Sequence, residues 1–217
     1  EQWMENLMEV LGDRQPDYLI ISHMEPDHAG SIGILTSAYP EMTLVGSAKA
    51  LAMLPNFFRQ VPTNPTIAVK EGDTLSLGEH TLHFVMAPMV HWPEVMVSYE
   101  EKEQVLFSAD AFGKFGALDT DEPWTDEARR YYINIVGKYG APVQTLLKKA
   151  AGLQIRTICP LHGPILNGDL TPYLQKYQTW SSYQPEESGV LVAYASIHGN
   201  TAKAAEFLSE QLWELGE

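Results

Sequence analysis

Four side chains able to bind a metal ion lie within six residues near the start of the chain. They are His23, Glu25, Asp27 and His28 in the segment His-Met-Glu-Pro-Asp-His. The apolar residues before them, 18–22, predict a strand. Alternate side chains of an extended segment point to one side, so the first three can converge on one centre, and a turn at the proline lets the segment face a second centre. This density of imidazole and carboxylate groups indicates a metal site.

Three further candidate ligands follow other predicted strands. His91 lies in Pro-Met-Val-His-Trp-Pro, His162 lies in Pro-Leu-His-Gly, and Asp110 ends the apolar run 105–109. Taken singly, a histidine beside proline or tryptophan is more often a packed residue, and an aspartate at a strand end is more often a turn cap. Taken together, imidazole and carboxylate groups at four separate strand ends favour a shared metal centre.

The donor atoms also limit the kind of metal. All candidates offer nitrogen or oxygen and none offers a thiolate, which disfavours a structural zinc site and an iron–sulfur cluster. Three of these histidines, His23, His91 and His162, together with the three carboxylates suit two first-row metal ions about 3.5–4 Å apart, with one carboxylate bridging them. Because carboxylates stabilise higher oxidation states, iron or manganese fits this set better than zinc.

A second candidate site is the loop 196–201, Ser-Ile-His-Gly-Asn-Thr, between the apolar run 189–195 and a predicted helix. Backbone N–H groups and hydroxyls at a helix N-terminus can bind a phosphate. The loop lacks the lysine of a Walker loop and the spacing of a dinucleotide fingerprint. Serine, glycine and asparagine are also ordinary turn formers, so the loop by itself leaves a plain turn open as the commoner interpretation.

The order of the predicted elements indicates an α/β fold. Strands and helices alternate over 18–69, short strands follow over 74–109, and helices then return around a strand at 156–159. The polar stretch around Pro185 is typical of a linker. We expect one domain over 1–184, a linker at 185–188 and the start of a second domain at 189–217, whose remaining elements lie outside this sequence.

Composition excludes several classes of partner. The 217 residues carry 14 Lys and Arg against 28 Asp and Glu, a net charge of −14, which disfavours nucleic acid and anionic membrane surfaces. The apolar runs are far shorter than the roughly 20 residues that cross a bilayer. The single cysteine, Cys159, and the absence of a secretory signal pattern predict a cytoplasmic location.

The motifs together resemble those of the flavodiiron proteins, also called A-type flavoproteins. The matching segments are residues 23–30, His91-Trp-Pro93, Ser108-Ala-Asp-Ala-Phe-Gly113, Leu161-His-Gly163 and the loop 196–201. The resemblance implies a metallo-β-lactamase-like αββα sandwich, whose first strands would precede Glu1, followed by the first β-loop-α unit of a flavodoxin-like doubly wound domain. Hydrolases of this fold carry a second histidine where this chain has Glu25.

The resemblance also implies a role for each candidate residue. One iron would be held by His23, Glu25 and His91, the other by Asp27 and His162, and Asp110 would bridge them. His28 matches the last histidine of the motif and is expected to orient a ligand rather than to bind iron. The phosphate of FMN would be bound by Ser196, His198, Gly199, Asn200 and Thr201.

The activity implied is the reduction of O2 to water, of NO to N2O, or of both, at two non-haem irons supplied with electrons through FMN. The electron donor would be rubredoxin or a rubredoxin/flavin reductase, and the protein would form a head-to-tail homodimer or a dimer of dimers. Two alternatives stay open at this point: a di-zinc hydrolase of the same fold, which activates water, and a binding or scaffold protein that keeps the fold without metals.

Overall fold

The computed structural model describes residues 2–120 and 122–216. Contacts divide the chain into two compact units, one ending at Ser182 and the other beginning at Tyr183. The larger unit contains two sheets and their covering helices, and the smaller unit contains one helix.

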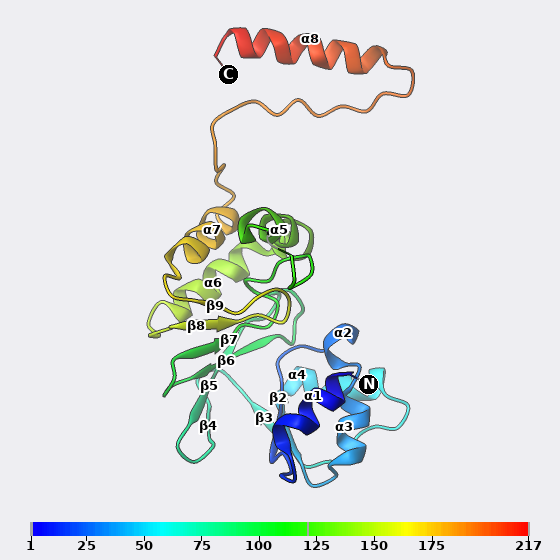
Figure 1. Cartoon of the computed structure of the whole chain (residues 1–217), viewed down its shortest axis with the longest axis vertical. Coiled ribbons are helices and arrows are strands. Elements are labelled where there is room, and N and C mark those ends of the chain that lie inside the picture. Colours follow the sequence, from blue (N-terminus) through cyan, green and yellow to red (C-terminus); the bar gives the residue numbers. More distant parts are fainter. Residues whose placement is uncertain (1, 121, 217) are drawn as a thin grey trace. The chain divides into compact units, whose positions relative to one another are not determined.

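The first sheet of the larger unit is parallel. It contains β1 (Tyr18–Ile21), β2 (Thr43–Ser47) and β3 (Thr66–Val69), paired in that order (Figure 1). The accompanying helices are α1 (Gln2–Leu11), α2 (Pro26–Ala29), α3 (Ile32–Ala38) and α4 (Ala48–Phe57). Parallel neighbours require crossover connections, and α3 and α4 lie in those crossovers. Buried side chains such as Ile21, Leu35 and Leu54 join these helices to one face of the sheet.

The second sheet has six strands and is antiparallel except for one pair. In spatial order it contains β4 (Thr74–Ser76), β5 (Thr81–Met86), β6 (Met96–Glu100), β7 (Val105–Phe107), β8 (Thr157–Cys159) and β9 (Leu166–Asn167). Strands β7 and β8 are parallel. The crossover between them carries α5 (Trp124–Tyr131), the π-helical turn η1 (Tyr132–Val136), the 3-10 turn η2 (Gly137–Tyr139) and α6 (Gly140–Ala150), and α7 (Thr171–Ser181) follows β9.

The two sheets pack face to face. Val45 and Val69 of the first sheet share a buried cluster with Leu82, Phe84 and Met96 of the second sheet. Burying one such side chain fully contributes about 1.5–3 kcal/mol. A separate cluster joins α5, α6 and α7 to the outer face of the second sheet. Helices therefore cover both outer faces, which confirms the predicted αββα sandwich.

Local boundaries differ from the sequence-based expectation in a few places. The helices expected before the strand at 156–159 start with α5, which begins at Trp124 with Pro123 in the N-cap position. The helical run then changes to a π-helical turn at Tyr132 and a 3-10 turn at Gly137 rather than continuing as one α-helix. The two-residue strand β9 was not expected, because so short a pairing leaves no hydrophobic alternation to read.

The smaller unit contains α8 (Asn200–Glu214) after the loop 196–201, as expected. The apolar residues 189–195 were expected to form a buried strand, yet no strand is assigned there and Leu191 is 91% exposed. A strand needs a neighbour for its backbone N–H and C=O groups, and the described residues of this unit supply only a helix. None of the described helices has both the length and the apolar character needed to cross a membrane.

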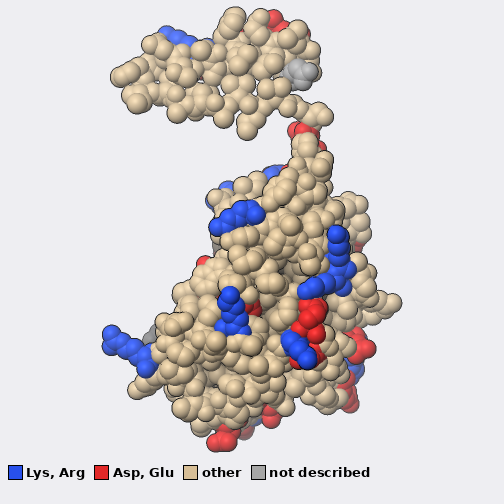
Figure 2. Space-filling model, turned by 180° about the vertical axis from the view of Figure 1, so that it is seen from behind, with Lys and Arg blue, Asp and Glu red and all other residues tan. Residues whose placement is uncertain are grey.

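Charged side chains are dispersed on the face shown in Figure 2, where Lys and Arg stand singly or beside acidic residues. Exposed ion pairs account for several of them, including Lys149 with Glu71 at 2.6 Å and Lys102 with Glu79 at 2.7 Å. Exposed pairs of this kind contribute about 0–1 kcal/mol. These ion pairs therefore compensate the charge of single lysines and add little to the stability of the fold.

The loop that follows β7 is held in place from α7. The backbone N–H of Phe112 donates to the hydroxyl of Tyr177 at 2.5 Å, and the two rings stack with centroids 4.2 Å apart. Phe112 has a φ of 68°, a left-handed conformation that a bulky residue adopts only when its surroundings impose it. Ser108 Oγ donates to the carbonyl of Ala111 at 2.7 Å. These contacts fix the short loop that carries Asp110.

We therefore expect Tyr177→Phe to destabilise the protein measurably. The substitution leaves the N–H of Phe112 buried without an acceptor, which costs about 1–3 kcal/mol of the free energy of unfolding. Urea denaturation of the full chain measures the loss. Tyr18→Phe, at a tyrosine that is 37% exposed, is the matched control and should change the free energy by less than about 0.5 kcal/mol. Equal effects of the two substitutions would contradict the role of this hydrogen bond.

Candidate metal centre

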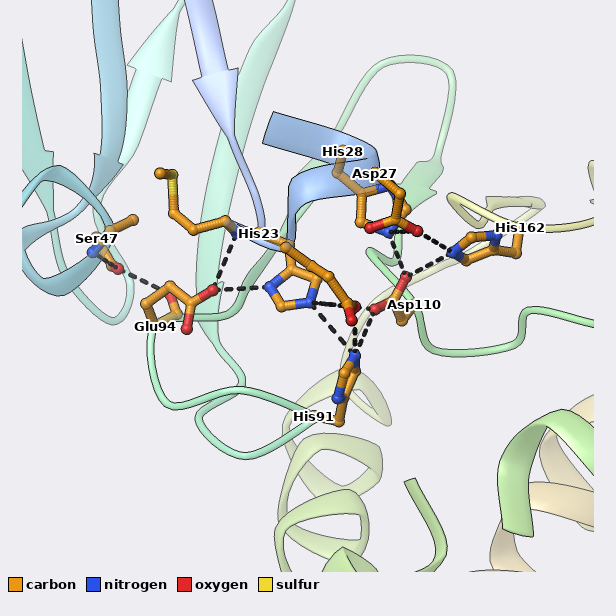
Figure 3. Close-up of polar contacts among 11 residues, drawn as sticks. His23, Asp27, His28, Ser47, His91, Glu94, Asp110 and His162 are labelled. Atoms are coloured by element: carbon orange, nitrogen blue, oxygen red, sulfur yellow. Dashed lines mark hydrogen bonds and ion pairs between the residues drawn. The ribbon is translucent and has the colours of Figure 1, made fainter. Parts of the chain in front are cut away.

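All seven candidate metal-site residues lie at one edge of the sandwich, where several strands end (Figure 3). They come from the end of β1 and helix α2 (His23, Glu25, Asp27 and His28), the loop between β5 and β6 (His91), the loop after β7 (Asp110) and the loop after β8 (His162). At this edge the N–H of Met96 donates to the carbonyl of Ser22 at 3.1 Å, which joins the two sheets. The fold therefore brings together residues separated by up to about 140 positions.

One cluster contains His23, Glu25, His91 and Asp110, which each offer one ligand atom within 4.8 Å of the others. His91 Nε2 lies 3.0 Å from Glu25 Oε2 and 3.0 Å from Asp110 Oδ2. His23 Nε2 lies 3.4 Å from Glu25 Oε2 and 3.3 Å from Asp110 Oδ2. Two imidazoles and two carboxylates thus face a common point.

The second cluster contains Asp27, His28 and His162, whose ligand atoms also lie within 4.8 Å of one another. Asp27 Oδ2 is 3.3 Å from His162 Nε2 and 3.5 Å from His28 Nε2. The side chains of Asp27 and His162 are 50% and 35% exposed, whereas that of His23 is fully buried. Glu25 of the first cluster is 33% exposed as well, so solvent meets the site at Asp27, His162 and Glu25.

Asp110 links the two clusters. Its Oδ2 faces His23 and His91, while its Oδ1 lies 3.1 Å from His28 Nε2 and 3.6 Å from His162 Nε2 (Figure 3). The residue is completely buried. One carboxylate whose two oxygens face two separate ligand groups is the arrangement that a bridging ligand requires.

The contacts within the site indicate that cations belong there. Both oxygens of Asp110 and Nε2 of His28 are buried, and none takes part in a hydrogen bond of normal geometry among the described residues. The Nε2 atoms of His23 and His91 face each other at 3.4 Å. Buried polar atoms without proper partners are costly, and metal ions between them would satisfy all of these atoms. The imidazole and carboxylate donors suit iron.

The pKa values of His23 and Asp110 are shifted because the imidazole and carboxylate groups of the site lie close together. Burial alone would lower the pKa of His23, but interactions with Asp110 and Glu94 outweigh it and raise the pKa to about 9. Burial alone would raise the pKa of Asp110, but the imidazoles of His23, His28 and His91 lower it well below its usual range. Asp110 is therefore ionised and ready to bind a cation. Metal bound at Nε2 of His23 would replace the proton there.

His28 lies closer to the site than its expected role requires. Its side chain is 12% exposed and its Nε2 stands among the ligand atoms of the second cluster. The orienting role inferred from the sequence stays a prediction. The position of Nε2 also permits a direct bond to a metal.

Two buried residues beside the site were not singled out from the sequence. Glu94 Oε1 lies 2.7 Å from His23 Nδ1, and the ring of Tyr131 lies 5.5 Å from that of His162. Burial and the negative charge of Asp110 raise the pKa of Tyr131, so its hydroxyl keeps its proton. Glu94 follows His91 by three residues in the same loop, and this nearness to a candidate ligand could have marked it in the sequence. No sequence signal marked Tyr131.

The candidate phosphate-binding loop precedes helix α8. Gly199 caps the helix with a φ of 81°, a conformation that favours glycine. Asn200 and Thr201 occupy the first turn, while Ser196 and His198 are exposed in the preceding segment. The backbone N–H groups of a first helical turn are the ones that can bind a phosphate. This geometry is compatible with the expected role and leaves that role a prediction.

Comparison with known proteins gives concordant results. A family described as "ODP family beta lactamase" matches residues 1–163. The chain is 35% identical to a rubredoxin-oxygen oxidoreductase of Megalodesulfovibrio gigas, with 95% of this chain and 54% of the relative aligned. It is 31% identical to a nitric oxide reductase of Moorella thermoacetica, with 98% of this chain and 55% of the relative aligned.

The chain also matches a solved structure of a flavodiiron protein. The flavodiiron protein of Giardia intestinalis matches with a TM-score of 0.76 and 27% identity, over 84% of this chain and 46% of the other. This chain spans about half or less of the curated relatives it matches, with shares between 36% and 55%. The expected resemblance to flavodiiron proteins is confirmed by these matches. Because the family match covers most of the chain and the fold agrees with it, the chain belongs to the ODP family beta lactamases.

Proposed function

We propose that the protein containing this chain is a flavodiiron oxidoreductase that reduces O2 to water, NO to N2O, or both. The single observation that carries the proposal is the buried carboxylate of Asp110, whose two oxygens face two separate groups of ligand atoms. The relatives named rubredoxin-oxygen oxidoreductase and nitric oxide reductase support this class of reaction. They do not favour one of the two gases over the other.

The ligand assignment that we propose follows the two clusters. His23, Glu25 and His91 would hold one iron, Asp27 and His162 the other, and Asp110 would bridge them. When bound, the irons would supply the electrons and the open coordination positions that a small uncharged substrate needs.

The protein groups around the ligands orient them and exclude water on one side. The Trp92 ring meets the His23 ring edge to face at 5.2 Å, and the side chain of His23 is fully buried. The other side is open, because Asp27, His162 and Glu25 are partly exposed. We infer that a diatomic substrate reaches the site from the side of these three residues.

Electron delivery through FMN is part of the proposal. The loop residues Ser196, His198, Gly199, Asn200 and Thr201 would bind its phosphate, in a flavodoxin-like domain that starts at 189 after the linker 185–188 and the di-iron domain 1–184. A rubredoxin or a rubredoxin/flavin reductase would supply the electrons in the cytoplasm. A head-to-tail homodimer, or a dimer of dimers, would bring the flavin of one subunit to the irons of its partner.

Glu25 argues against the di-zinc hydrolase. The third carboxylate, Glu25, stands 3.0 Å from His91 Nε2, within the cluster that a hydrolase of this fold fills with one more histidine. Added negative charge favours metals that reach higher oxidation states. The metal content of the protein separates the two functions directly.

We expect the purified full-length protein to contain about two irons per chain together with FMN. Asp110→Ala should lose most of the iron and abolish consumption of O2 and NO, because both ions lose their shared ligand, while FMN stays bound. Elemental analysis, flavin absorbance and gas-electrode assays measure the three quantities. Asp126→Ala, which removes an exposed carboxylate on α5, is the control. Two zinc ions without flavin, or an active Asp110→Ala variant, would refute the proposal.

The flavin loop gives an independent prediction. The double substitution Ser196→Ala, Thr201→Ala removes two hydroxyl donors expected to face the phosphate. Hydrogen bonds to a charged group contribute about 1.5–3 kcal/mol each, so losing two of them should lower FMN affinity by about 100-fold or more, with the iron content unchanged. Titration of the flavin-free, full-length protein by fluorescence quenching measures the affinity. Ser209→Ala, on an exposed position of α8, should bind FMN as the wild type does; an equal affinity of the double variant would place the phosphate elsewhere.

A further inference from the structure

A buried carboxylate lies behind the imidazole of His23, on the side away from the metal-facing atoms (Figure 3). The side chain of Glu94 is completely buried. Its Oε1 lies 2.7 Å from His23 Nδ1 and also accepts the backbone N–H of Met24 at 2.9 Å. The backbone carbonyl of Glu94 accepts from Ser47 Oγ at 2.7 Å. One residue thus connects the His23 segment, the loop of His91 and the start of α4.

The contact with Glu94 determines which ring nitrogen of His23 faces the metal site. A carboxylate facing Nδ1 makes this nitrogen the hydrogen-bond donor, which leaves Nε2 to face Glu25, His91 and Asp110. A negative charge on the Nδ1 side also increases the electron density that Nε2 offers to a metal. The two N–H groups that face Oε1, from the His23 ring and the Met24 backbone, favour the charged form of the carboxylate.

This support is specific to one histidine of the proposed ligand set. In the part of the chain that the structure describes, the contacts of His91 and His162 with carboxylates all use Nε2, the metal-facing nitrogen. His23 alone among the three has a carboxylate on each ring nitrogen. Its orientation is therefore set from behind by a group that does not itself reach the site.

We propose that Glu94 is a positioning residue for the metal centre: it holds His23 with Nε2 toward the first metal and strengthens that nitrogen as a donor. The proposal rests on the proposed function, since it assumes that His23 binds a metal. It adds a residue that lies outside the set of ligands. It also predicts that the effect of Glu94 is exerted on the first cluster, not on Asp27 and His162.

The test uses Glu94→Gln in the full-length protein. Glutamine keeps the size and one acceptor oxygen and removes the charge. Glu100→Gln is a closely matched control, because Glu100 is also a buried carboxylate, lies 2.9 Å from His80 Nδ1 and accepts backbone N–H groups. His80 belongs to neither ligand cluster. The two variants therefore differ in whether the histidine concerned faces the metal centre.

Three measurements are made on both variants: iron affinity, the midpoint potential of the iron centre, and the proton resonance on Nδ1 of His23 in zinc-loaded protein carrying 15N-labelled histidine. Glu94→Gln should lower iron affinity by about 10–100-fold. It should shift the potential to more positive values, because the ferric state loses a negative charge nearby, and move the Nδ1 proton upfield. Glu100→Gln should leave all three unchanged. A merely structural role of Glu94 would not shift the potential or the resonance of folded protein.

Each outcome decides the question. If Glu94→Gln binds iron with wild-type affinity and potential, the proposal is overturned. If the wild type binds no iron, but its zinc-loaded form shows a downfield Nδ1 proton that Glu94→Gln moves, then the proposed function fails while the positioning role holds. If Glu94→Gln does not fold, the zinc-loaded wild type decides alone: a hydrogen-bonded proton on Nδ1 supports the proposal, and a proton on Nε2 overturns it.

Discussion

The burial of one negative charge, the carboxylate of Asp110, is the constraint on which the site depends. An ionised carboxylate without solvent must be compensated by nearby positive charge or by hydrogen bonds, and four imidazoles supply the nearest polar atoms. The loop that carries Asp110 is fixed by Tyr177 from the helix layer that covers the second sheet. Gly113 lets the loop close, because a Cβ there would lie 3.1 Å from both the Asp110 carbonyl and the Tyr131 ring. The carboxylate, the loop and helix α7 therefore form one unit.

The sandwich provides the remaining geometry. Each ligand-bearing segment follows a strand, and strands of two different sheets end at the same edge. The link between Met96 and Ser22 keeps these ends in register. The rigid core between the sheets, formed by side chains such as Val45 and Phe84, means that the ligand groups are held by packing rather than by each other. Because the core is rigid, packing can hold several carboxylates and several imidazoles close together.

The alternation of apolar runs predicted an α/β fold, and the family resemblance added the sandwich. The density of polar groups in 23–28 marked residues that the structure brings together with His91, Asp110 and His162, and their roles as ligands stay predictions. Glu94 was marked only by its nearness to His91 in the sequence, because its contact with His23 spans 71 positions. Nothing in the sequence marked Tyr131, whose place beside His162 comes from packing. For residues 189–195 the sequence predicted an element that the structure does not contain. These apolar residues read as a buried strand, but pairing is a property of neighbours and not of the run itself.

The unequal exposure of the ligand side chains has a consequence for assembly of the site. The carboxylates of Asp27 and Glu25 are 50% and 33% exposed, whereas the side chains of His23 and Asp110 are 0% and 1% exposed. An ion arriving from solvent would therefore meet the carboxylates of Asp27 and Glu25 first. It would reach His23 and Asp110 only after giving up water molecules, so these two exposed carboxylates would serve as the point of entry for metal.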